Sequence, residues 1–219
     1  MTVGFAALWK NTDQEYRATR ADERGTTATI QAAFARGRDR GIQAYGLYSC
    51  RFSSSWQYFT FWVSPGMDAV LNSITDLERA GDFKFANSRH TVGIYLPQQT
   101  GVKPAAWQEI PSPDDALASY AALRFHRGSG SHAAASHSDS ADVRFYGEFD
   151  CRFSSGWDQF SFWTGSSFAA LEETLAVYEA GLDGPSTSEV IVGKLDRFYR
   201  FGSHLQTDLT WLEGEWQES

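Results

Sequence analysis

Cys50–Trp62 reads CRFSSSWQYFTFW, and Cys151–Trp163 reads CRFSSGWDQFSFW. At a constant offset of 101, the two segments share Cys, Arg, Phe, Ser, Ser, Trp, Phe, Phe and Trp. The same offset relates Tyr45-Gly46 to Tyr146-Gly147, so the match extends beyond the segments themselves. A self-match at a fixed period is the signature of repeated structural units. The sequence therefore predicts a duplicated domain.

Length, composition and charge limit the class of protein. The chain has 219 residues, which suits two domains of about 100 residues each. Hydrophobic residues make up 42% and aromatic residues 15%, enough for a packed core and for the wall of an apolar pocket. The net charge of −8 disfavours binding to nucleic acid or to anionic membranes.

The sequence also gives expectations about location. We see no signal peptide at the N-terminus, and no apolar run approaches the roughly 18 residues of a membrane-spanning helix. Cys50 and Cys151 occupy equivalent places in the two repeats, a poor arrangement for a disulfide. We therefore expect a reduced, cytoplasmic protein that is a monomer or a homodimer.

Hydrophobic periodicity predicts the secondary structure of the first half as β-α-β-β-α-β, the order of a ferredoxin-like unit. The expected elements are a strand at 3–9, a helix from 26 or 27 to 40, strands at 42–52 and 56–63, a helix at 67–80 and a strand at 89–96. Gly41 and Gly81 are expected to end the two helices.

The second half repeats this order with one shortened connection. Tyr120-Ala121-Ala122-Leu123 matches Phe5-Ala6-Ala7-Leu8 at an offset of 115. The offset falls to 101 at the next strand, so the connection between the first two strands is 14 residues shorter in the second half. What remains there is rich in Gly, Ser and His. The predicted domains are repeat 1 at 1–97, a Pro-rich linker at 98–115, repeat 2 at 116–196 and a tail at 197–219.

This topology, together with the hairpin and the FxFW strand, resembles the dimeric α/β-barrel superfamily in a tandem form. The resemblance implies an α+β fold, with two ferredoxin-like βαββαβ repeats packed sheet to sheet as an intrachain barrel and helices outside. Members include cofactor-free monooxygenases, cyclases, isomerases, and the haem-binding chlorite dismutase and aldoxime dehydratase groups. The resemblance therefore implies an architecture and leaves the reaction open.

Strand alternation sorts side chains between the helix side and an expected cavity between the sheets. We expect Phe59 and Phe61, and their counterparts Phe160 and Phe162, to pack against helices. The opposite face, rich in amphipathic residues, is then expected to line the cavity. The expected substrate-binding residues are Phe5, Trp9, Tyr58, Trp62, Tyr120, Gln159 and Trp163.

Most candidate catalytic residues lie where the copies differ. Leu47 and Ser49 in the first repeat are replaced by Glu148 and Asp150 in the second. Carboxylates and imidazoles serve as general acids and bases, and arginines stabilise developing negative charge such as an enolate. The candidates are Glu148, Asp150, His126, Arg124 and Arg152. A structural alternative is that Glu148, Asp150 and Arg152, on the second strand of the repeat, face water at a sheet edge and prevent edge pairing.

The leading interpretation is an enzyme that acts on an apolar or aromatic small molecule by acid/base chemistry without a cofactor. It would be a cyclase, isomerase, lyase or cofactor-free monooxygenase of the kind used in secondary metabolism. A non-catalytic small-molecule binding protein is an alternative.

Haem binding is the other alternative, and it rests on the resemblance. In the chlorite dismutase-like group the axial histidine lies between the first two strands of the second repeat. His132 and His137 occupy that region here. The spacing of these residues and His126 does not favour a zinc site, so no other metal is expected.

Overall fold

The computed structural model describes residues 1–12, 20–81, 86–96, 115–128, 141–151, 156–181 and 186–197, without side-chain detail for 20–28 and 197. Its elements are β1 (Val3–Asn11), α1 (Arg20–Asp39), β2 (Gln43–Ser49), β3 (Tyr58–Ser64), α2 (Met67–Ala80), β4 (Ala86–Tyr95), η3 (Ala116–Ala118), β5 (Tyr120–Arg127), β6 (Val143–Asp150), β7 (Gln159–Gly165), α4 (Phe168–Ala180) and β8 (Thr187–Arg197). The predicted linker and tail lie almost wholly outside the described residues. Among those residues, no helix is both long enough and apolar enough to cross a membrane.

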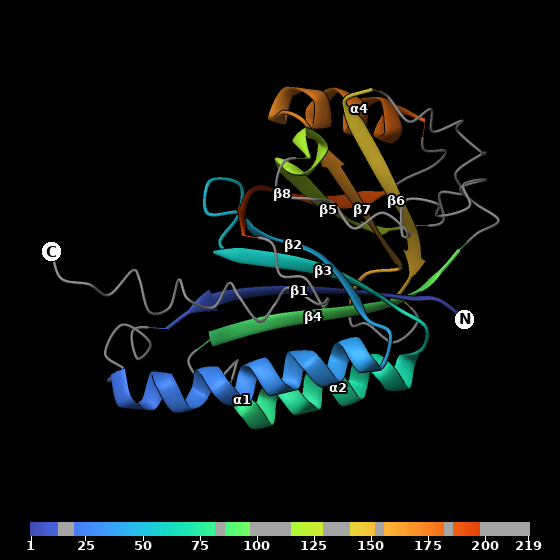
Figure 1. The fold of residues 1–219 in the computed structure, drawn as a ribbon. Coiled ribbons are helices and arrows are strands. Elements are labelled where there is room, and N and C mark those ends of the chain that lie inside the picture. Colours follow the sequence, from blue (N-terminus) through green and yellow to red (C-terminus); the bar gives the residue numbers. More distant parts are fainter. Residues whose placement is uncertain are drawn as a thin grey trace, which may run out of the picture.

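The eight strands form one closed antiparallel barrel in the order β1-β3-β2-β8-β5-β7-β6-β4. Helices α1 and α2 cover one side of the barrel and α4 covers the opposite side (Figure 1). The predicted α+β class is confirmed, and the strands form one eight-stranded antiparallel sheet. Each half contributes four neighbouring strands, β4-β1-β3-β2 and β8-β5-β7-β6.

Local chemistry explains several element boundaries. Gly81 ends α2 in the left-handed conformation, and its amide donates to the carbonyls of Leu77 and Glu78. The side chain of Ser167 accepts from the amide of Ala170 and begins α4. β2 ends at Ser49, earlier than predicted, because residues 51–53 form a turn. α1 begins at Arg20, earlier than predicted.

The barrel interior is filled by aromatic side chains from both halves. Phe61 and Phe162 stack with ring centroids 4.4 Å apart, and Phe149 stacks on Phe160 at 4.9 Å. All four side chains are almost completely buried in one cluster that spans the two halves. The centre of the barrel is therefore an aromatic core.

The predicted assignment of strand faces is wrong. Phe59, Phe61, Phe160 and Phe162 point into the barrel, while Trp62 and Trp163 pack under the helices. Both faces of these strands are buried, one by the opposite half and one by helices. Hydrophobicity therefore reveals the alternation but not which face is inside.

The strand register also corrects the alignment of the two first strands. Phe5 pairs with Trp62, and Ala122 pairs with Trp163, so Ala122 and not Tyr120 corresponds to Phe5. The two strands are thus offset by 117 residues. The short motif of alternating small and apolar residues fits equally well at registers two residues apart, because the side-chain period of a strand is two.

Candidate functional site

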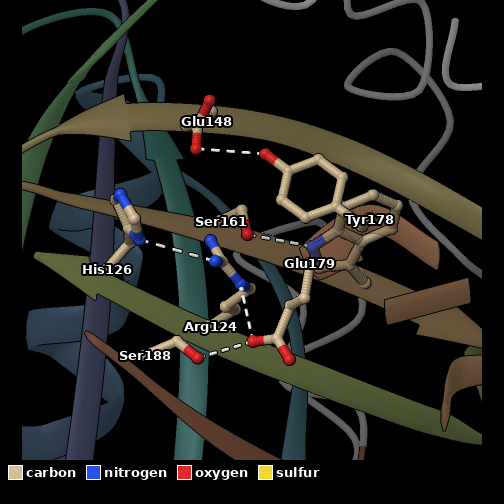
Figure 2. A network of polar contacts seen from close by, with 8 residues as sticks. Arg124, His126, Glu148, Ser161, Tyr178, Glu179 and Ser188 are labelled. Carbon is tan, nitrogen blue, oxygen red and sulfur yellow. Dashed lines mark hydrogen bonds and ion pairs between the residues drawn. The ribbon is translucent and has the colours of Figure 1, made fainter. Parts of the chain in front are cut away.

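A cluster of buried polar side chains lies on the outer face of the second half, beneath the last turn of α4 (Figure 2). Strand pairing places Glu148, Ser161 and Arg124 in one row across β6, β7 and β5. Tyr178 and Glu179 reach this row from α4. With Ser188 of β8, which donates to Glu179, the cluster is held by four strands and a helix.

Arg124 is the buried cation of this cluster, with 1% of its surface exposed. Its Nε donates to Oε1 of Glu179 at 3.2 Å, and the Ser188 hydroxyl donates to the same oxygen at 2.5 Å. The guanidinium carbon also lies 5.1 Å from the centre of the Tyr178 ring. A buried charge is tolerated only when it is paired and hydrogen-bonded, and Glu179 meets that requirement.

His126 is fully buried beside Arg124 (Figure 2). Nη2 of Arg124 lies 3.5 Å from Nδ1 of the imidazole. A guanidinium can only donate, so Nδ1 is the acceptor in this contact. A histidine that binds a metal through Nε2 usually donates from Nδ1 instead. His126 is therefore arranged as a hydrogen-bonding residue.

Glu148 is also almost completely buried, and Oε1 accepts from the Tyr178 hydroxyl at 3.1 Å. Burial, followed by the nearby charge of Glu148, raises the pKa of Tyr178 far above its usual value. Tyr178 therefore remains a protonated donor across the physiological pH range.

An apolar wall adjoins the polar row. The centroid of the Trp163 ring lies 4.1 Å from that of Phe145 and 5.1 Å from that of Tyr178. The indole Nε1 of Trp163 donates to the Ser161 hydroxyl at 2.9 Å. The corresponding row of the first half contains Leu47, Thr60 and Ala7, and its outer face packs against α1 and α2. Of these two rows, only that of the second half contains charged side chains.

A cavity of about 610 Å³ opens on the same outer face, near the first turn of α4 and the junction of β2 with β8. Its lining residues are Ser49, Phe52, Tyr120, Phe168, Lys194, Leu195 and Asp196. Phe52 and Phe168 are among the most exposed large apolar side chains of the described residues. Their ring centroids are 6.2 Å apart.

Solved structures resemble this fold over most of its length. Chlorite dismutase from Candidatus Nitrospira defluvii, in complex with imidazole, has a TM-score of 0.63 at 10% identity, with 89% of this chain and 91% of that chain covered. A heme-binding protein from Thermus thermophilus has a TM-score of 0.62 at 14% identity, covering 89% and 90%. The fold is similar to that of chlorite dismutase. No family model matches the chain, and no curated protein matches it.

These similarities correct the functional expectation. The leading interpretation, a cofactor-free enzyme, and the expectation of no cofactor are both wrong, because the fold neighbours include a heme-binding protein and chlorite dismutase. They favour the haem-binding alternative. Lyase, isomerase and monooxygenase activities gain no support from these neighbours.

The structure brings together only part of the predicted site. Arg124, His126 and Glu148 meet, but on the outer face and not between the sheets. Asp150 and Gln159 pair in the next row, beside His126. Arg152, His132 and His137 lie outside the described residues.

The predicted substrate-binding residues divide between two opposite faces. Phe5, Trp9 and Trp62 pack under the helices of the first half, where Tyr58 contacts Trp9. Tyr120 and Trp163 pack under α4. These two groups therefore do not line one shared cavity.

Sequence reasoning missed Tyr178, Glu179, Ser161 and Ser188. Glu179 matches Glu78 of the first repeat and was therefore indistinguishable from scaffold. Only the packing of α4 on the sheet shows that Tyr178 and Glu179 reach Glu148 and Arg124.

Proposed function

We propose that this protein binds haem on the outer face of its second half. The observation that carries the proposal is the cavity of about 610 Å³ beside the first turn of α4, in a fold similar to that of a heme-binding protein. Exposed aromatic side chains, Phe52 and Phe168, and the cation Lys194 line this cavity. When bound, haem supplies redox or ligand-binding chemistry at its iron.

The residues of this face fit such a group. A porphyrin needs an apolar surface, cationic partners for its carboxylates and an axial ligand. Phe52, Tyr120 and Phe168 give the cavity beside α4 an aromatic lining, and its volume of about 610 Å³ lies within the roughly 300–1,000 Å³ typical of cofactor sites. Lys194 lines that cavity as an exposed cation, which suits a carboxylate better than Arg124, already paired with Glu179.

His132 or His137, in the sequence between β5 and β6, would bind the haem iron. In the chlorite dismutase-like group, which the sequence resembles, the histidine that binds the iron lies between the same two strands. His126 is not proposed as the ligand, because its Nδ1 accepts from Arg124.

Titration of the purified protein with haemin tests the proposal. We expect a Soret band that saturates at one haem per chain, and its loss in either His132→Ala or His137→Ala. His204→Ala, in the predicted tail, is the matched control and should bind as the wild type does. A wild-type protein that develops no saturable Soret band would overturn the proposal. Retention of the band in both His132→Ala and His137→Ala would exclude these residues as ligands.

We further infer that the barrel consists of tandem ferredoxin-like repeats, 1–97 and 116–196. The matching segments at offset 101 support this inference, as does the identical strand order of the two halves.

A further inference from the structure

The two seams where the halves meet have the same register. In one seam Tyr48 pairs with Leu195, and in the other Phe149 pairs with Tyr95. Tyr48 corresponds to Phe149 and Leu195 to Tyr95 in the alignment of the halves. The halves are therefore related by an approximate two-fold rotation, as two identical subunits would be.

Some side chains contact their own counterparts across this rotation axis. Phe61 stacks on Phe162 at 4.4 Å, and the rings of Tyr45 and Tyr146 lie 5.0 Å apart. A residue can touch its own counterpart only near the axis of a two-fold arrangement. The axis therefore passes through the aromatic interior of the barrel.

Arg89 and Glu189 form a third such pair, and this pair is charged. Arg89 pairs with Leu8 in β1, and Glu189 pairs with Phe125, the counterpart of Leu8, in β5. Nη1 of Arg89 lies 2.9 Å from Oε2 of Glu189, and the guanidinium carbon lies 4.4 Å from the centre of the Phe125 ring. Both side chains are about one-third exposed.

We infer that this pair directs each half to bind the other half and not a second copy of itself. In a like-with-like assembly of two chains, Arg89 would face Arg89 and Glu189 would face Glu189. Phe61 and Tyr45 meet residues of similar shape in either arrangement, so the aromatic contacts do not discriminate. Like charges brought together disfavour the wrong partner, which is how charged positions provide pairing specificity.

Charge reversal in the full-length chain tests this inference. Arg89→Glu and Glu189→Arg each place like charges at the axis, and we expect each to lower the Tm by about 5 °C. The double variant should recover most of that loss. Wild-type Tm in both single variants, or no recovery in the double variant, would overturn the inference.

Co-refolding gives a readout of pairing that is separate from stability. The two single variants are given different affinity tags and refolded together. The first half of each chain can then pair with the second half of the other chain, and each such pair of halves has one Arg and one Glu at positions 89 and 189. We expect mixed assemblies well above the level seen with two differently tagged wild-type chains. A yield equal to that baseline would contradict the inference, even if the single variants fold poorly alone.

The Arg144–Asp115 ion pair supplies a matched control. Its atoms lie 3.0 Å apart at a similar degree of burial, but Arg144 belongs to the second half and Asp115 directly precedes η3 of that half. Arg144→Asp and Asp115→Arg should each reduce stability. Mixing them should not increase mixed assembly, because exchange of halves leaves each like-charged pair intact.

Discussion

At the scale of single residues, the proposed site depends on three replacements within one row of the barrel. Where the first half has Ala7, Leu47 and Thr60, the second has Arg124, Glu148 and Ser161. A buried arginine or glutamate is costly without a partner. Glu179 and Tyr178 of α4 are the partners of Arg124 and Glu148. The charged strand residues are therefore stable only in the presence of these helix residues.

Tyr178→Phe tests this dependence. Removing the hydroxyl deprives the buried Glu148 of a donor, and we expect a loss of about 1–2 kcal/mol in the free energy of unfolding. Urea denaturation measures the difference. Tyr58→Phe is the control, since its hydroxyl accepts an exposed bond from Arg51 and its loss should change stability by less than about 0.5 kcal/mol. Equal losses in both variants would show that the hydrogen bond to Glu148 contributes no more to stability than the exposed bond from Arg51 to Tyr58.

His90 predicts a dependence of stability on pH. Burial lowers the pKa of His90 below its usual 6.5, and the charge of Glu78 opposes this shift only partly. Between the lowered folded pKa and 6.5, the unfolded chain binds a proton that the folded protein does not. Stability present above pH 6.5 should therefore be lost as the pH falls through this window.

Comparison with His90→Val isolates this contribution, because Val190 occupies the corresponding position of the second half. Urea midpoints measured between about pH 5 and pH 8 should fall more steeply with acidification in the wild type than in the variant. Parallel pH profiles would rule out His90 as the source.

At the scale of elements, β4 and β8 approach the neighbouring strands closely at one glycine each. A Cβ on Gly93 would lie 2.6 Å from Cβ of Phe149, and a Cβ on Gly193 would lie 2.6 Å from Cβ of Tyr48. These glycines are needed for space, since the aromatic residues of the opposite half occupy the volume that a side chain would fill.

Gly93→Ala and Gly193→Ala should therefore each destabilise the protein, by about 1–3 kcal/mol, through overpacking of the seams. Chemical denaturation provides the measurement. Gly66→Ala is a suitable control, because nothing lies within 4 Å of the added Cβ and its φ of −175° is extended backbone. If all three variants match the wild type, the seams are looser than the structure indicates.

At the scale of the whole molecule, the two halves share one aromatic core. Phe61 is fully buried and stacks on Phe162 of the other half. Phe61→Ala should cost about 3–5 kcal/mol, and unfolding should remain a single transition because both halves lose packing together. Circular dichroism and tryptophan fluorescence should give coincident curves. A second transition, retained at the wild-type midpoint, would show that the second half folds independently.

Much of the fold could be predicted because it depends on local patterns. The repeat around Cys50 and Cys151, the alternation of the strands and the glycine that ends α2 all act within a few residues along the chain. The site was harder to predict. Glu148 stands out because it interrupts an otherwise matching repeat, whereas Tyr178 lies on a helix whose packing partner no local pattern reveals.

The sequence by itself determined the order of the elements, the α+β class and the residues at which the two copies differ. Only the tertiary structure decided which face of each strand is inside, that the interior is an aromatic core, and that Arg124, His126 and Glu148 meet beneath α4. The physical reason is that period and propensity are properties of one segment, whereas burial on either side of a strand depends on which other elements pack there.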